Sequence, residues 1–139
     1  MNAFYFAILT ALVWGCVPIL EKAGLMRIDP MPGLFLRVFG VATGLIVLSI
    51  FNIQALKTAL KADLRTISLI MLGGFLASVV GQMFFYHALK SGEASKVVPI
   101  SGTYPLVSFL LGVIFLGESL TISKGFGVLL VVAGLFLLR

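Results

Sequence analysis

The C-terminal third of the chain constrains the fold most, because it holds two apolar segments joined by a short polar link. Residues 97–116 contain no charged side chain. At a rise of 1.5 Å per residue, a helix of this length crosses about 30 Å, the thickness of the bilayer hydrocarbon. The chain turns polar at residues 117–124 and is apolar again afterwards. Helices that are apolar on every face belong in a membrane, so this segment predicts a transmembrane hairpin.

The rest of the chain has the same character. Of its 139 residues, 60% are hydrophobic and 11% are charged, whereas a soluble domain has about 25% charged residues. We therefore expect an all-α integral membrane protein with five transmembrane helices, forming a single domain over residues 1–139. Pro18 is expected to bend or end the first helix. The expected spans are residues 3–20, 33–53, 67–89, 97–116 and 122–138.

The longest polar segment, residues 54–66, repeats a basic and a leucine position every four residues. On one continuous helix this spacing gives adjacent basic and apolar stripes, which is typical of a helix lying in the lipid headgroup layer. The net charge of +5 is therefore assigned to contact with phospholipids and not to nucleic acid. The basic positions are Lys57, Lys61 and Arg65, and the leucines are Leu56, Leu60 and Leu64.

The basic residues give no strong orientation. Five spans place the termini on opposite sides of the membrane. If the N-terminus is cytoplasmic, that side receives Lys57, Lys61, Arg65 and Lys124. The other side receives Lys22, Arg27, Lys90, Lys96 and Arg139. Four residues against five is a weak bias under the positive-inside rule, so one hypothesis is that the chain inserts both ways and pairs antiparallel.

Polar side chains inside the first three spans are candidates for a binding site, because such groups are costly in lipid. Arg37 lies early in the second span, where it either reaches the interface or holds an anionic substrate. Gln82 and Tyr86 share one face of the third span, where they either bond a neighbouring helix or line a cavity. Trp14 in the first span is either a lipid-facing residue or an aromatic wall for a ligand.

The fourth span contains a second polar group. Ser101, Tyr104, Pro105 and Ser108 have the spacing of one helix face. Pro105 removes a backbone donor, and polar side chains around a broken helix suit a ligand site in the middle of a membrane. The proline is also compatible with a simple packing kink.

Residues for covalent chemistry are missing from this pattern. All five Asp and Glu residues are expected at the polar breaks and none within a span. The sequence shows no nucleophile with a base, no metal-ligand cluster and no phosphate loop. We therefore expect no catalytic residues, no metal and no cofactor, and a protein that is not an enzyme.

The order of several motifs resembles an EamA-type repeat, the five-helix unit of the drug/metabolite transporter superfamily. These are Trp14-Gly15 followed by Lys22, Arg37 early in the second span, and the fourth-span proline followed by Leu116-Gly117-Glu118. Typical members carry two such repeats in inverted orientation and export metabolites, amino acids or drugs across the inner membrane. The last two spans are also similar to small multidrug resistance proteins. The essential first-helix carboxylate of those proteins has no match here, and Trp14 occupies the comparable position.

The resemblance implies one half of a ten-helix inverted-repeat fold and a half-size secondary transporter working by alternating access. It would act as a homodimer, antiparallel in one version, or as a heterodimer with a second half, in the inner membrane. Two alternatives stay open: a flippase for a polyprenyl-phosphate-linked sugar or another lipid, held by Lys22 and Arg37, and a non-transporting subunit. Glu118 would be structural, and Gly127 and Gly134 would pack against a partner helix. The expected substrate-binding residues are Trp14, Arg37, Gln82, Tyr86, Ser101 and Tyr104.

Overall fold

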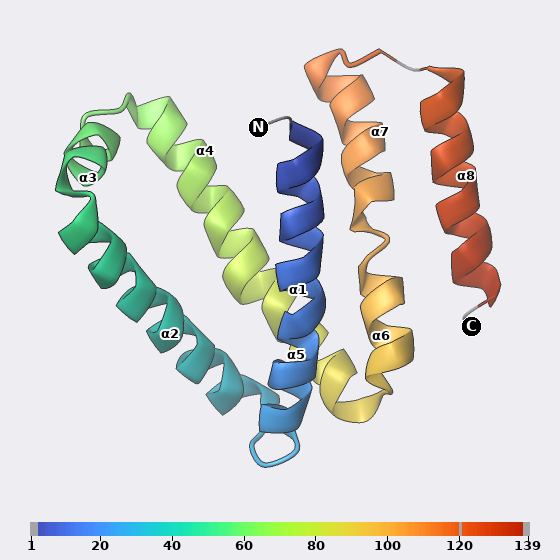
Figure 1. The fold of residues 1–139 in the computed structure, drawn as a ribbon, viewed down its shortest axis with the longest axis horizontal. Helices are drawn as coiled ribbons and strands as arrows, with labels where there is room; N and C mark the ends of the chain where they lie inside the picture. The colour runs from blue at the N-terminus through green and yellow to red at the C-terminus, as the bar shows by residue number, and fades with distance from the viewer. Residues whose placement is uncertain (1–2, 120, 138–139) are drawn as a thin grey trace. The chain divides into compact units, whose positions relative to one another are not determined.

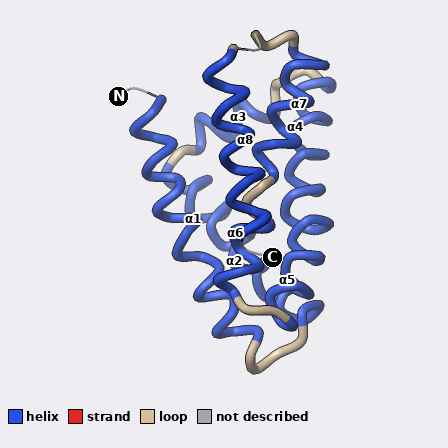
Figure 2. Tube along the Cα trace, turned by 90° about the vertical axis from the view of Figure 1, so that its right-hand side faces the viewer, coloured by secondary structure: helices blue, strands red, loops and turns tan. Residues whose placement is uncertain are grey.

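The computed structural model describes residues 3–119 and 121–137, and every regular element in these ranges is helical (Figures 1 and 2). The chain divides into two compact units, Met1–Lys90 and Ser91–Arg139, which we call unit 1 and unit 2. Each unit is described by itself. The all-helical fold class expected from the apolar segments is confirmed.

Unit 1 contains three long helical segments and one short connecting helix. The third long segment, Leu64–Ser91, is continuous over 28 residues but changes character midway, because η1 is a π-helix inserted between two α-helices. A π-helix has a wider turn than an α-helix and is often found at functional sites. The elements are α1 (Ala3–Leu25), α2 (Pro30–Phe51), α3 (Ile53–Leu60), α4 (Leu64–Phe75), η1 (Leu76–Gly81) and α5 (Gln82–Ser91).

Asp63 explains why the long polar segment is not one helix. Its side chain caps α4 by accepting hydrogen bonds from the Thr66 backbone N–H at 3.0 Å and the Thr66 hydroxyl at 2.7 Å. These hydrogen bonds also lower the pKa of Asp63. Lys61 is the C-cap of α3, and Arg65 lies in the first turn of α4. The prediction of one helix carrying Lys57, Lys61 and Arg65 is therefore wrong.

Four helical segments are long and apolar enough to cross a membrane: Ala3–Leu25, Pro30–Phe51, Leu64–Ser91 and Ala94–Leu116. They correspond to the first four predicted spans. The fifth predicted span coincides with α8 (Ile122–Leu137), whose apolar part, Ile122–Gly134, is shorter. The fifth crossing therefore stays a prediction. Residues 138–139, at its expected C-terminal end, lie outside the described residues.

Pro18 does not end the first helix. It is buried inside α1, which continues to Leu25, so the helix extends beyond the predicted end of the first span at residue 20. A proline inside a helix removes one backbone hydrogen bond. Beyond the proline, Glu21 and Lys22 form hydrogen bonds to α2 and α5, so contacts with other helices also hold this part of α1.

The small core of unit 1 lies where α1, α2 and α5 meet, at the lower end in Figure 1. Leu25, Leu34, Tyr86 and Leu89 are at most 6% exposed there. Gly33 permits this packing, since a Cβ atom at that position would lie 3.0 Å from Leu25 Cδ2. Most other large apolar side chains on these helices are exposed, as expected for surfaces that contact lipid or other membrane helices.

Unit 2 begins with an interrupted helix. α6 (Ala94–Ser101) and α7 (Tyr104–Leu116) are separated by Gly102 and Thr103. The predicted break in the fourth span is thus present. Pro105 lies in the first turn of α7, where a missing backbone N–H costs least.

The end of α7 is closed by Gly117 and Glu118. Gly117 has φ = 66°, a left-handed conformation that favours glycine, and the Glu118 backbone N–H donates to the Gly112 carbonyl at 3.2 Å. The Glu118 carboxyl group lies over Gly112, which fits the structural role expected for this residue. At Gly127 and Gly134 no described atom lies within 4 Å of an added Cβ, so this face of α8 is open in unit 2.

Candidate functional site

A cluster of polar side chains from three helices is centred on Glu21 in unit 1. Glu21 lies in the last part of α1, and its side chain is 12% exposed. It accepts hydrogen bonds from Arg37 on α2 and from Gln82 and Tyr86 on α5. We call these four residues the Glu21 cluster.

Arg37 forms the ionic part of the cluster. Its Nε lies 3.3 Å from Glu21 Oε1, and its Nη1 donates to the backbone carbonyl of Ser78 at 3.4 Å. Ser78 belongs to η1, so Arg37 joins α2 to the π-helix as well as to α1. An unpaired arginine inside a membrane helix costs about 2.5–3.5 kcal/mol. Pairing with Glu21 reduces this cost, and the side chain does not need to reach the interface.

Gln82 and Tyr86 complete the contacts of the carboxylate. Gln82 Nε2 lies 3.1 and 3.2 Å from the two carboxylate oxygens of Glu21, and the Tyr86 hydroxyl donates to Oε1 at 2.9 Å. Gln82 and Tyr86 are four residues apart, which places both on the same side of α5. Glu21 Oε1 thus accepts from three donors, and the network is fully connected.

Two lysines hold the ends of α1 and α5 together. Lys22 on α1 donates from Nζ to the Leu89 carbonyl in the last turn of α5. Lys90 on α5 donates to the Leu25 carbonyl at 2.6 Å and to the Ile28 carbonyl at 3.0 Å. Carbonyls in the last turn of a helix lack backbone partners and attract cations. Each helix therefore supplies the cation that caps the other.

The structure brings together three of the six residues expected to bind substrate: Arg37, Gln82 and Tyr86. Trp14 is 61% exposed and lies seven residues before Glu21 on the same face of α1, about 10 Å along the helix. Ser101 and Tyr104 flank the break between α6 and α7 in unit 2. Their binding roles stay predictions.

Glu21 is the residue that sequence reasoning missed. Glu21 lies within α1, which continues to Leu25, and not in a polar break between helices as the sequence predicts. A helix boundary near Pro18 places Glu21 in a polar break. Its spacing of seven residues from Trp14 was the available signal that both lie on one helix face. Among the described residues, no three His, Cys, Asp or Glu side chains are grouped so that they could hold a metal ion.

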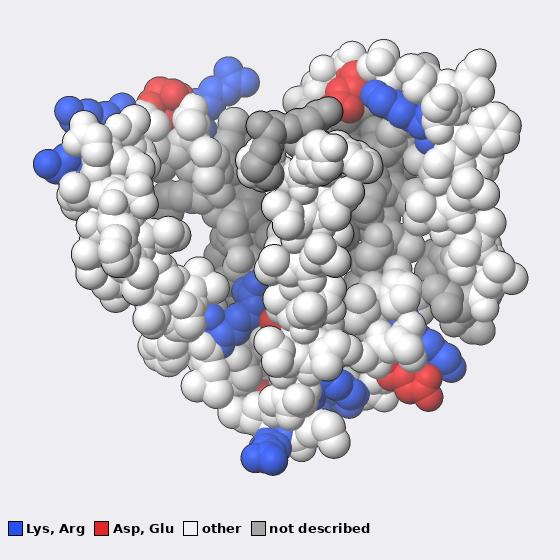
Figure 3. All heavy atoms as spheres, in the orientation of Figure 1, with Lys and Arg blue, Asp and Glu red and all other residues white. Residues whose placement is uncertain are grey.

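Several apolar spans and a polar cluster between them define a multi-pass helical membrane protein. Figure 3 shows most Lys and Arg of unit 1 at its two ends, with a smaller group of charged side chains between them. The chain belongs to the EamA-like transporter family, which it matches over residues 1–139. The family is one of membrane transporters, which is consistent with the expectation that the chain is not an enzyme.

Several curated proteins are similar to this chain. An uncharacterised protein of Methanocaldococcus jannaschii is 31% identical over 93 residues, 67% of each chain. A probable amino-acid metabolite efflux pump of Salmonella typhimurium is 27% identical over 146 residues, covering 99% of this chain and 48% of the pump. An uncharacterised transporter of Bacillus subtilis is 38% identical over 72 residues, covering 52% of this chain and 23% of that protein. The chain thus spans about half the length of the efflux pump. No solved structure matches it with comparable significance.

Proposed function

We propose that the chain is a half-size secondary transporter that moves a small metabolite or drug-like molecule across the inner membrane. It works by alternating access, as a homodimer or with a second half. The Glu21 cluster is the observation that carries this proposal, since ionisable residues within membrane helices mark substrate or ion pathways. The match to half of a longer efflux pump supports an assembly of two such units.

The cluster has a mechanical role as well as a binding role in this proposal. Glu21 ties the ends of α1, α2 and α5 together, so the unit is closed where its core lies. A substrate that replaces Arg37 or Gln82 as a partner of Glu21 would release these helix ends. In alternating access, contacts between helices close one end of the substrate path in one state of the transporter. The same contacts must open in the other state.

The chemistry of the cluster suits a substrate with groups of both charges. Arg37 offers a donor for a carboxylate, and Glu21 offers an acceptor for an ammonium group. The name of the Salmonella relative makes amino acids the first compounds to test. The lipid flippase is less well supported, because Arg37 and Lys22, the cations expected to hold a lipid phosphate, both have partners within unit 1.

We expect Gln82→Ala to leave the protein folded and to lower transport about tenfold, which corresponds to about 1.4 kcal/mol of lost interaction. The assay is efflux of a panel of radiolabelled amino acids from loaded proteoliposomes. Gln54→Ala, which removes an exposed glutamine from α3, is the matched control and should transport normally. Efflux by Gln82→Ala equal to that of Gln54→Ala would remove Gln82 from the site.

Unit 2 is tested separately in the same vesicles. Tyr104→Ala should also lower efflux, whereas Tyr5→Ala, at another exposed tyrosine, should not. If only the unit 2 variant transports normally, Tyr104 is removed from the site while the Glu21 cluster stays in it.

Reporters fused to the C-terminus test the proposed pairing. In the antiparallel homodimer, we expect strong signals from both a cytoplasm-active and a periplasm-active reporter. The physical reason is the nearly equal number of basic residues on the two sides. A signal from one reporter alone contradicts dual insertion. In that case a second half in the opposite orientation must be sought, and failure of the purified chain to self-associate would favour the subunit role.

A further inference from the structure

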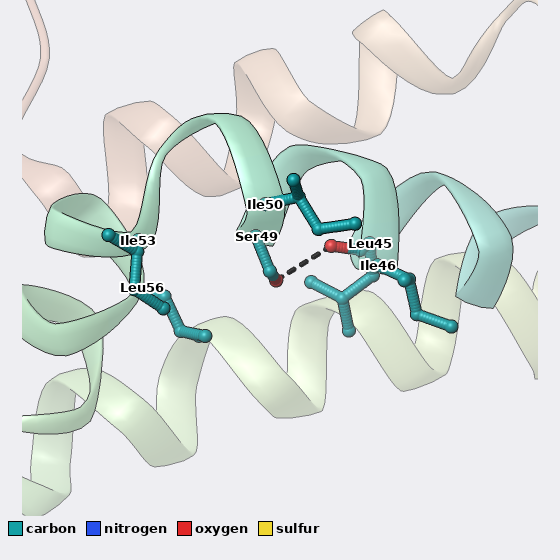
Figure 4. A pocket seen from close by; sticks show the side chains of 6 residues that line it. All are labelled: Leu45, Ile46, Ser49, Ile50, Ile53 and Leu56. Atoms are coloured by element: carbon teal, nitrogen blue, oxygen red, sulfur yellow. Dashed lines mark hydrogen bonds between the residues drawn. The ribbon is translucent and has the colours of Figure 1, made fainter.

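A groove at the junction of α2 and α3 is lined almost entirely by aliphatic side chains (Figure 4). Its volume is about 460 Å³, and all its lining residues belong to these two helices. The single polar lining group is the Ser49 hydroxyl, which donates to the Leu45 carbonyl at 2.7 Å. The groove therefore presents an apolar surface. The lining residues are Leu45, Ile46, Ser49, Ile50, Ile53 and Leu56.

The α3 end of the groove lies at the level expected for one membrane surface. α3 links two helices that are each long and apolar enough to span the bilayer, so it lies at one bilayer surface. Ile53 and Leu56 line the groove from α3, and the α2 residues continue from there toward the hydrocarbon. The groove thus runs from the headgroup level into the region of the acyl chains.

Three cations lie at the corner formed by α3 and the start of α4: one on α3, one at its C-cap and one in the first turn of α4. Lys57, Lys61 and Arg65 are all exposed, and none has an ion-pair partner among the described residues. Lys57 follows Leu56 directly and lies one helical turn from Ile53, so it is close to the mouth of the groove. Figure 3 shows blue spheres on both sides of a red group at the end of unit 1 where α3 lies.

The acidic residue in this segment, Asp63, forms no ion pair with these cations among the described residues. Asp63 directs both carboxylate oxygens to Thr66, to the backbone N–H and to the hydroxyl. Both interactions belong to the cap of α4. Three cations and one carboxylate leave the corner with a net positive charge next to an apolar groove, and this combination is complementary to an anionic phospholipid.

We propose that this corner binds one anionic phospholipid, with an acyl chain in the α2–α3 groove and the phosphate held by Lys57, Lys61 and Arg65. A zwitterionic lipid has the same acyl chains but no net charge to match the three cations. A basic residue near an anionic lipid surface changes binding about fivefold. This site is separate from the Glu21 cluster and does not depend on the transport proposal.

The test is native mass spectrometry of the purified chain in a neutral detergent, titrated with dioleoyl phosphatidylglycerol or dioleoyl phosphatidylcholine. We expect the wild type to retain phosphatidylglycerol at least about tenfold better, and the triple variant Lys57→Gln/Lys61→Gln/Arg65→Gln to lose this preference. The matched control, Arg27→Gln/Lys96→Gln/Lys124→Gln, removes the same charge elsewhere and should keep it. Equal retention of the two lipids by the wild type, or equal loss in the two triple variants, overturns the proposal.

The groove is tested by filling it. Ser49→Phe should lower phosphatidylglycerol retention, whereas Gly44→Phe should not, because Gly44 lies on the opposite side of α2 and no described atom lies within 4 Å of a Cβ added there. If Ser49→Phe does not fold, the groove is tested with the wild type and phosphatidylglycerol that has six-carbon acyl chains. This short-chain lipid should bind more weakly than the dioleoyl form. Retention that is insensitive to both groove filling and chain length overturns the acyl-chain site.

Discussion

Replacing Glu21 with glutamine should lower the free energy of unfolding by about 3 kcal/mol, because it leaves Arg37 without a carboxylate inside a membrane helix. The value is at the low end of the range for buried pairs, since the Arg37 side chain is 28% exposed. Glutamine keeps the size of the side chain, so the loss reports charge and hydrogen bonding and not packing. The measurement is denaturant unfolding in detergent micelles, followed by circular dichroism.

The control for Glu21→Gln is Glu93→Gln. Glu93 also has an ion-pair partner, Lys96 at 3.8 Å, but its side chain is 72% exposed, so the loss should stay within about 0.5 kcal/mol. The double variant Glu21→Gln/Arg37→Gln completes a cycle in which we expect a coupling of at least about 1 kcal/mol. Equal stability of the Glu21 and Glu93 variants would contradict the role given to the cluster.

The second large effect is expected from the two lysines that cap each other's helices. Lys22→Met/Lys90→Met keeps the apolar stems but removes the charged donors to the last carbonyls of α1 and α5, at a cost of about 3 kcal/mol. Each single variant should cost about 1.5–2 kcal/mol. The double variant should lose less stability than the sum of the two single variants, because both lysines join the same two helix ends. The same unfolding measurement applies.

Lys96→Met is the matched control for the lysine variants. The Lys96 side chain is 60% exposed, and its ion-pair partner among the described residues is the nearby Glu93, so little change is expected. A double variant as stable as Lys96→Met would show that water serves the two helix ends as well as the lysines do.

The sequence predicts the helical class and the first four spans well, because hydrophobicity over about twenty residues leaves few alternatives. It does not predict where α1 ends. Pro18 carries a local preference to stop the helix, but the contacts of Leu25, Glu21 and Lys22 with other helices prevail over it. The hydrogen bonds of Glu21 and Lys22 to α5 join residues more than sixty positions apart, and no local pattern contains them.

The candidate site was likewise predictable only where residues close in the sequence define it. Gln82 and Tyr86 were found because they share a helix face, and Arg37 because a charge in a span is costly. Their common partner was not found, since its place in the site depends on the course of α1 beyond Pro18. The helix break near Pro105 was predictable, because proline acts locally, although the interruption lies at Gly102 and Thr103.

The π-helix η1 determines which side of α5 faces Glu21. One extra residue in a helical turn rotates everything that follows by about 100° relative to an unbroken α-helix. Without it, the face carrying Gln82, Tyr86 and Lys90 would point elsewhere, although the apolar length of the span would hardly change. A single inserted residue can thus change which polar side chains of a membrane helix face the neighbouring helices. Relatives that lack such an insertion would present different side chains at equivalent depths, and so a different set of partners for a substrate.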